Sequence, residues 1–222
     1  MSALFSPLTL RSVTLPNRIA MSPMCQYMAK DGVASPWHIV HLGSRAVGGT
    51  GLVIAEATAV EPRGRLTPGC LGLWSAAQAD ALKPVTDFIK SQGSVPGIQL
   101  AHSGRKGARA RPWEGNGPLP AGEGWEIIAP SALAYGNYQM PREMTEADCD
   151  AVEAAFAGAA RNAVRAGFTL LTLHFAHGYL LHSFFSPLTN LRTDRYGGDA
   201  ERRAAFPLRV AAAVRAAWPE DL

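Results

Sequence analysis

Two imidazoles and a phenol lie within six residues of one another in this chain, at His174, His177 and Tyr179. They follow the apolar run Leu170–Leu173, which has the length and composition of a strand buried on both faces. Ligands of parallel sheets bind just beyond the carboxyl ends of the strands, so chemistry is expected at these rings. A straight strand points His174 and His177 to opposite faces, so a shared target requires a turn, which Gly178 makes easy.

The spacing of this cluster leaves three interpretations open. The rings could hydrogen-bond a carbonyl oxygen and supply a proton, they could bind a metal ion, or they could satisfy one another as a structural cluster. A metal site needs further ligands, and the available ones, His182 and Asp194, lie at no recognisable metal-binding spacing.

Other candidate residues end the earlier apolar runs of the chain. Cys25 follows the first run, Ala57 ends the second, and Gln99 and His102 end the third. Taken alone, Gln99 is best explained as a buried amide whose hydrogen bonds are satisfied within the protein. Cys25 could be a thiol tuned by a nearby redox centre, or an inert buried cysteine. Their shared location at the ends of successive strands favours a site, because barrel enzymes assemble their active sites there.

Apolar runs of strand length alternate with segments of helical periodicity along the chain. We predict strands at residues 19–24, 51–57, 95–100 and 170–173, helices at residues 36–47, 84–92, 146–166 and 200–218, and a kink at Pro207. Residues 1–17 suit a short hairpin or lid, and a Gly/Pro-rich loop follows the third strand as far as Pro141. This alternation implies right-handed crossovers and a parallel sheet.

Four such units make either a small open sheet or part of a larger barrel. A (β/α)8 barrel has eight strands and typically about 250 residues. The count of units alone therefore leaves both architectures open. Half a barrel would carry unpaired strand edges.

Composition points to an ordinary globular protein, with 47% hydrophobic and 18% charged residues. A net charge of +3 is too small to indicate a nucleic-acid or membrane partner. Basic residues cluster once, at Arg105, Lys106, Arg109 and Arg111, where they could receive a phosphate or form a solvated loop face.

The cysteines and the N-terminus indicate the compartment. Cys25, Cys70 and Cys149 are odd in number and widely spaced, which argues against a disulfide framework and fits a reducing cytosol. The N-terminus lacks a basic region before an apolar stretch, and no apolar run reaches membrane-spanning length. We expect a cytoplasmic protein.

Several blocks of the chain carry a family resemblance. They are LFSPLTLRSVTLPNRI, MSPMCQY from Met21, GLVIAEATAVEPRGR, GIQLAHSGRK, and HFAHGYLLHSFFSPLTNLRTDRYGG together with Arg203. Together they resemble the Old Yellow Enzyme family of FMN-dependent NADPH dehydrogenases and ene-reductases. Cys25 and Tyr27 point to its YqjM-like, xenobiotic-reductase branch.

The resemblance implies a flavin site and a substrate site. The residues that it places against FMN are Ser22, Pro23, Met24, Cys25, Ala57 and Gln99. His174 and His177 would hold the carbonyl oxygen of an α,β-unsaturated substrate with help from Tyr27, and Tyr179 would protonate the α-carbon. NADPH would be the reductant, and no metal is implied.

The resemblance implies a single FMN-binding (β/α)8-type barrel domain, of which residues 1–222 would form the N-terminal part, with about the first four β/α units. It therefore also implies strands that residues 1–222 do not contain. In the family, the fifth strand supplies an arginine to the flavin, and the loops after strands seven and eight bind its phosphate. Alternatives are therefore a non-catalytic half-barrel remnant, or a subunit that needs a partner half. A weaker alternative is a metal-dependent barrel hydrolase using His174, His177 and His182. We expect a small-molecule enone as substrate, and a homo-oligomer or a complementing C-terminal half as partner.

Overall fold

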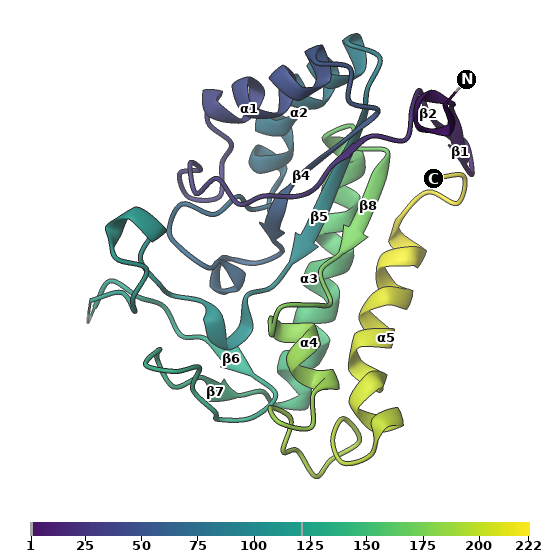
Figure 1. Cartoon of the computed structure of the whole chain (residues 1–222). Helices are drawn as coiled ribbons and strands as arrows, with labels where there is room; N and C mark the ends of the chain where they lie inside the picture. Colours follow the sequence, from purple (N-terminus) through teal and green to yellow (C-terminus); the bar gives the residue numbers. More distant parts are fainter. Residues whose placement is uncertain (1, 121) are drawn as a thin grey trace.

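Four parallel strands form the central sheet of the computed structural model, which describes residues 2–120 and 122–222. The strands are β3 (Ala20–Met21), β4 (Leu52–Ala59), β5 (Val95–Ala101) and β8 (Leu170–Leu173), in the spatial order β3-β4-β5-β8 (Figure 1). All four predicted strands are confirmed, although β3 is only two residues long. Met1 and Ala121, within the predicted N-terminal segment and the long loop, lie outside the described residues.

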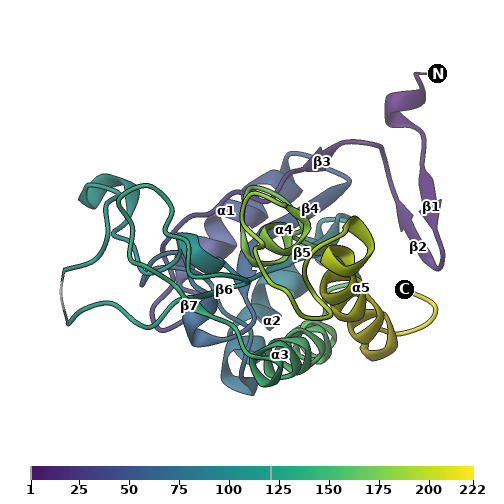
Figure 2. The same ribbon diagram turned by 90° about the horizontal axis from the view of Figure 1, so that it is seen from below.

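Four long helices form a curved layer along one side of these strands (Figure 2). They are α1 (Pro36–Val47), α2 (Ala76–Ser91), α3 (Glu146–Arg165) and α5 (Ala200–Ala217). Each was predicted, and the alternation of strand and helix gives the expected parallel connections. A short helix, α4 (Leu180–Phe185), was not predicted, because its six residues are too few to show helical periodicity.

The prediction for α2 was wrong at its N-terminus. The helix begins at Ala76, because Ser75 and Gln78 form a capping box in which each side chain accepts the backbone N–H of the other. Pro84 therefore lies inside the helix and does not begin it. Helix α5 likewise runs through Pro207, where the kink stays a prediction.

The main hydrophobic core lies between the sheet and the helix layer. Phe156 of α3, Leu82 of α2 and Ile98 of β5 are fully buried in it. An aromatic group extends this core beneath α4, where the ring centroids of Phe184 and Phe206 lie 4.6 Å apart. This packing fixes the helices that flank the carboxyl ends of β5 and β8.

A two-stranded hairpin covers the opposite, amino-terminal end of the sheet. It consists of β1 (Leu8–Leu10) and β2 (Val13–Leu15), as the alternation of residues 1–17 predicted. Leu15 packs against Leu52 and Val95 in a separate small cluster. The hairpin thus lies far from the strand ends that carry the candidate site.

The long loop after β5 contains short elements only. They are the 3-10 turns Gly104–Lys106 and Pro112–Glu114 and the paired strands β6 (Ile128–Ala129) and β7 (Arg142–Glu143). At the start of α3, Thr145 and Asp148 form a capping box, in which the side chain of each accepts the backbone N–H of the other.

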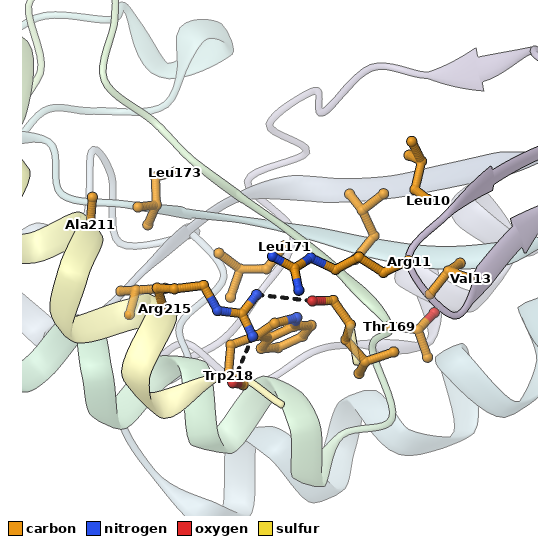
Figure 3. A pocket seen from close by; sticks show the side chains of 12 residues that line it. Leu10, Arg11, Val13, Thr169, Leu171, Leu173, Ala211, Arg215 and Trp218 are labelled. Atoms are coloured by element: carbon orange, nitrogen blue, oxygen red, sulfur yellow. Dashed lines mark hydrogen bonds between the residues drawn. The ribbon is translucent and has the colours of Figure 1, made fainter. Parts of the chain in front are cut away.

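The outer edge of β8 borders an apolar groove of about 530 Å³ (Figure 3). Leu171 and Leu173 form one wall of the groove, and Val214 of α5 and the following Trp218 form another. Every residue of β8 is half-buried, whereas the adjacent strand β5 is almost entirely buried. Strands β8 and β3 are the two edges of the described sheet.

Core packing makes Phe156 a sensitive position. Its side chain is 0% exposed, so replacing it with alanine removes apolar burial and leaves a cavity, and we expect Phe156→Ala to lower the free energy of unfolding by about 3–5 kcal/mol. Urea denaturation followed by circular dichroism measures the change. Phe5→Ala is the matched control, since Phe5 is 65% exposed and its loss should change stability little. Equal effects of the two substitutions would contradict the assignment of this core.

Candidate functional site

The predicted three-ring cluster forms at the carboxyl end of β8. The ring centroid of His174 lies 4.8 Å from that of His177 and 4.8 Å from that of Tyr179. The expected turn is present, because His177 and Gly178 both have left-handed backbone conformations, with φ of 60° and 70°. The turn brings both imidazoles and the phenol to one side of the chain.

Hydrogen bonds assign the tautomer of each imidazole. The backbone N–H of Ala176 donates to Nδ1 of His174, so the proton of the neutral His174 ring lies on Nε2. That Nε2–H faces Nδ1 of His177 at 3.1 Å and donates to it. The remaining proton of His177 therefore lies on its Nε2, where it is free to donate to another acceptor.

Burial changes the protonation of these groups. It lowers the pKa of His174 to about 4, with a further contribution from His177, so His174 is a neutral imidazole at neutral pH. Burial also raises the pKa of Tyr179 to about 12, so its phenol keeps its proton. A neutral imidazole and a protonated phenol are both hydrogen-bond donors.

Residues at the carboxyl ends of β3, β4 and β5 line the same cavity as this cluster. The cavity has a volume of about 360 Å³. Its lining includes the predicted site residues Ser22, Pro23, Cys25, Ala57, Gln99, His174, His177 and Tyr179. Met24, also predicted, is not part of the lining, and its side chain is 48% exposed.

Tyr27 lies beside the cavity and is held by two arginines of the long loop. Its ring packs in a small cluster with Cys25 and Tyr179. Arg109 donates from Nη2 to the phenolic oxygen of Tyr27 at 3.2 Å, and Arg111 donates from Nε to its carbonyl oxygen at 3.1 Å. The sequence analysis identified these arginines as a basic cluster but did not connect them with Tyr27.

Glu56 is a site residue that the sequence analysis missed. It occupies an irregularity in the β4–β5 ladder, between Ala55 and Ala57, and is only 3% exposed. Its Oε2 accepts the backbone N–H of Gln26 at 3.0 Å, which ties the segment carrying Cys25 to β4. The signal available in the sequence was a single carboxylate within an apolar strand.

His38 of α1 is the partner of this carboxylate. Its Nδ1 accepts the backbone N–H of Ser35, so its proton lies on Nε2, which faces Oε1 of Glu56 at 3.4 Å.

Burial, together with Cys70 and Glu56, raises the pKa of Cys25 to about 12. Cys25 is therefore a thiol and not a thiolate at neutral pH.

His102 and His182 have structural partners. His102 is buried, with Nε2 2.8 Å from Oε1 of Glu61 and Nδ1 accepting the N–H of Gly104. His182 accepts the N–H of Gly178 on its Nδ1. Residues 2–120 and 122–222 contain no group of three or more His, Cys, Asp or Glu side chains placed to hold a metal ion. The metal-dependent hydrolase alternative thus lacks a ligand set in this part of the chain.

Comparisons with known proteins match almost the whole chain. The family model described as NADH:flavin oxidoreductase / NADH oxidase family matches residues 3–222. An NADPH dehydrogenase of Listeria welshimeri is 48% identical over 221 residues, which are 98% of this chain and 61% of that protein. An NADH:flavin oxidoreductase of Gibberella zeae is 46% identical over 222 residues, which are 97% of this chain and 54% of that protein.

Solved structures match equally well. Morphinone reductase superposes with a TM-score of 0.86 at 32% identity, over 98% of this chain and 60% of that one. The old yellow enzyme homologue from Zymomonas mobilis also gives 0.86, at 30% identity, over 99% of this chain and 61% of that one. The chain thus spans little more than half the length of the relatives it matches.

Glu56 gives a prediction about the reactivity of Cys25. Glu56→Gln weakens the attachment of Gln26 and removes a charge that raises the pKa of Cys25, so we expect alkylation by iodoacetamide to accelerate on the order of tenfold, equivalent to about 1.4 kcal/mol. Peptide mass spectrometry separates Cys25 from the buried Cys70 and Cys149. Glu61→Gln, which removes another histidine-paired carboxylate, is the control. Equal rates in both variants would refute the role of Glu56.

His174 gives a prediction about stability and pH. Its pKa is about 4 in the folded protein against an ordinary 6.5, so the unfolded chain binds the proton more readily between these values. The stability due to the neutral ring is complete above about pH 6.5 and is lost as pH falls towards 4. We expect His174→Asn to flatten the pH dependence of unfolding in this window, measured by urea titration at several pH values. An unchanged slope would contradict the burial argument.

Proposed function

This chain belongs to the NADH:flavin oxidoreductase / NADH oxidase family, and on that premise we propose that it forms part of an FMN-dependent NADPH:acceptor oxidoreductase of the ene-reductase type. The proposed reaction is reduction of the C=C bond of an α,β-unsaturated carbonyl compound. The observation that carries it is the convergence of His174, His177 and Tyr179 on the cavity that Cys25 and Gln99 also line.

The lining of the cavity fits the ring portion of FMN. Ala57 has no side chain beyond Cβ and leaves room for a flat ring, and the amide of Gln99 offers both a donor and an acceptor to a heterocycle edge. None of the residues that line the described cavity is a lysine or arginine, so the lining suits the ring and not the phosphate. When bound, FMN supplies the hydride-transfer chemistry, with NADPH as reductant.

The imidazoles would act on the carbonyl oxygen of the substrate. Two N–H donors directed at an oxygen that gains negative charge form an oxyanion hole, worth about 3–4 kcal/mol per donor. His174 and His177 now bond to each other, so the Nε2–H of His174 must turn from His177 to the substrate oxygen. Tyr179 would then donate its phenolic proton to the α-carbon, and Tyr27 would help to hold the substrate.

The open sheet favours a partner for this chain. The unpaired edge of β8 and the apolar groove beside it suit a complementing polypeptide that carries further strand–helix units, or a second copy in a homo-oligomer. A non-catalytic half-barrel is the second candidate function, and the same open edge favours it.

No helix of the described residues has the length and apolarity needed to cross a membrane. The free Cys25, Cys70 and Cys149 support a location in the cytoplasm.

Complementation tests the proposed function. We expect the 222-residue chain alone to retain little FMN on gel filtration, because its cavity lining offers no cation to the phosphate. Co-expression with the remaining strand–helix units of the Listeria welshimeri relative should restore flavin retention, NADPH oxidation and enone reduction. In that complex, His177→Ala should lower enone reduction about 10²–10³-fold without loss of flavin.

Two outcomes decide between the candidates. A complemented protein that retains flavin but reduces enones equally well without His177 would refute the role of the imidazoles. A complemented protein with neither flavin nor activity would favour the non-catalytic half-barrel.

A further inference from the structure

Three cations of the loop after β5, Arg105, Lys106 and Arg109, here called the rim, form no ion pair within the described residues. All three are partly buried. The ion pairs of residues 2–120 and 122–222 join other basic residues to carboxylates but include none of these three. Arg111, two residues further on, does pair with a carboxylate, that of Glu114 at 2.8 Å. The absence of acid is therefore local to the rim.

Neutral groups surround Lys106. Its Nζ donates to the carbonyl oxygen of His177 at 2.6 Å and lies 4.3 Å from the ring centroid of Tyr135. The ring of Tyr179 is 5.8 Å away. Arg105 also lies over the Tyr135 ring, at 5.6 Å, so two cations contact one aromatic ring.

Neutral groups surround Arg109 as well. Its guanidinium donates to the phenolic oxygen of Tyr27, to Oδ1 of Asn116 at 2.8 Å and to the phenolic oxygen of Tyr138 at 3.4 Å. Its Nε is buried without a hydrogen-bond partner. Hydroxyl and amide oxygens satisfy the donors of a guanidinium but do not neutralise its charge.

The rim is therefore electropositive, and its two arginines destabilise the charge of Lys106. Burial lowers the pKa of Lys106, and the charges of Arg105 and Arg109 lower it further. A cleft lined by one sign of charge attracts ligands of the opposite sign. Lys106 contacts the backbone of His177, and Arg109 contacts Tyr27, so both cations adjoin the groups that would hold a substrate.

We propose that Lys106 and Arg109 bind an anionic group, a carboxylate or a phosphate, on the molecule whose reacting end lies at His174 and His177. This inference rests on the proposed function only for the identity of that reacting end. The anionic group has two possible sources, an acidic substituent on the unsaturated acceptor and the phosphates of NADPH. In both cases a bidentate or charge-assisted contact to Arg109 and Lys106 supplies the selectivity.

Calorimetric titration of the 222-residue chain tests the proposal without flavin or turnover. The probes are cinnamaldehyde, 4-carboxycinnamaldehyde, NADPH and inorganic pyrophosphate. If the anion belongs to the acceptor, we expect the carboxylated aldehyde to bind about tenfold more tightly than the neutral one, with a preference that falls as salt rises. If it belongs to NADPH, we expect NADPH and pyrophosphate to bind with the same salt dependence while the two aldehydes bind alike.

Variants assign the effect to the rim. The double variant Lys106→Gln/Arg109→Gln should abolish the anion preference. Lys106→Arg keeps the positive charge and should therefore keep the anion preference. Lys83→Gln with Arg202→Gln removes two exposed cations elsewhere and is the matched control. Thermal unfolding confirms that each variant is folded.

The proposal would be overturned if the rim variants left the binding of all four probes unchanged. It would also be overturned if none of the charged probes bound. Loss of enone reduction in the complemented protein, with the anion preference intact, would instead refute the proposed function and leave this inference standing.

Discussion

The register of the parallel ladder is the constraint on which the site depends. Ala57 of β4 pairs with Gln99 of β5, and Gln99 pairs in turn with Thr172 of β8, so residues from three distant segments lie side by side. The ladder continues one residue beyond β8, where the backbone N–H of His174 donates to the carbonyl oxygen of Leu100 at 3.0 Å. A shift of one residue would turn every side chain of a strand to the other face and disperse the site.

A buried carboxylate and two partly buried cations contact the segments that carry this site. Glu56 accepts the backbone N–H of Gln26 next to Cys25, and its charge adds to burial and Cys70 in raising the pKa of the Cys25 thiol. Lys106 and Arg109 lie at the rim and face neutral groups only. His174 is neutral at neutral pH, so in the proposed reaction an oxygen that gains negative charge would meet N–H donors there.

The sequence allowed the fold class to be predicted because buried parallel strands read as apolar runs. The family resemblance and the assignment to four units of a (β/α)8-type barrel are confirmed by the family model and by the old yellow enzyme homologue. The strand-end residues could be found because position in a parallel sheet determines where side chains meet. Glu56 and Arg109 could not, because their roles lie in contacts with Gln26 and Tyr27 that no periodicity reveals. His174, His177 and His182 form no metal-ligand group within the described residues, where Nδ1 of His182 accepts a backbone N–H.

The two open edges limit which partner can complete the structure. One added strand at β8 would only move the unpaired edge outward, whereas closure from β8 round to β3 of an eight-stranded barrel requires four more strands. A second copy would supply four strands but would place a second His174 cluster at the same mouth. A complementing polypeptide would leave the facing wall free to carry cations for a phosphate, which the described cavity lining lacks. The curated relatives extend well beyond the residues they share with this chain, and strand–helix units of that further length would add strands without adding a second His174 cluster.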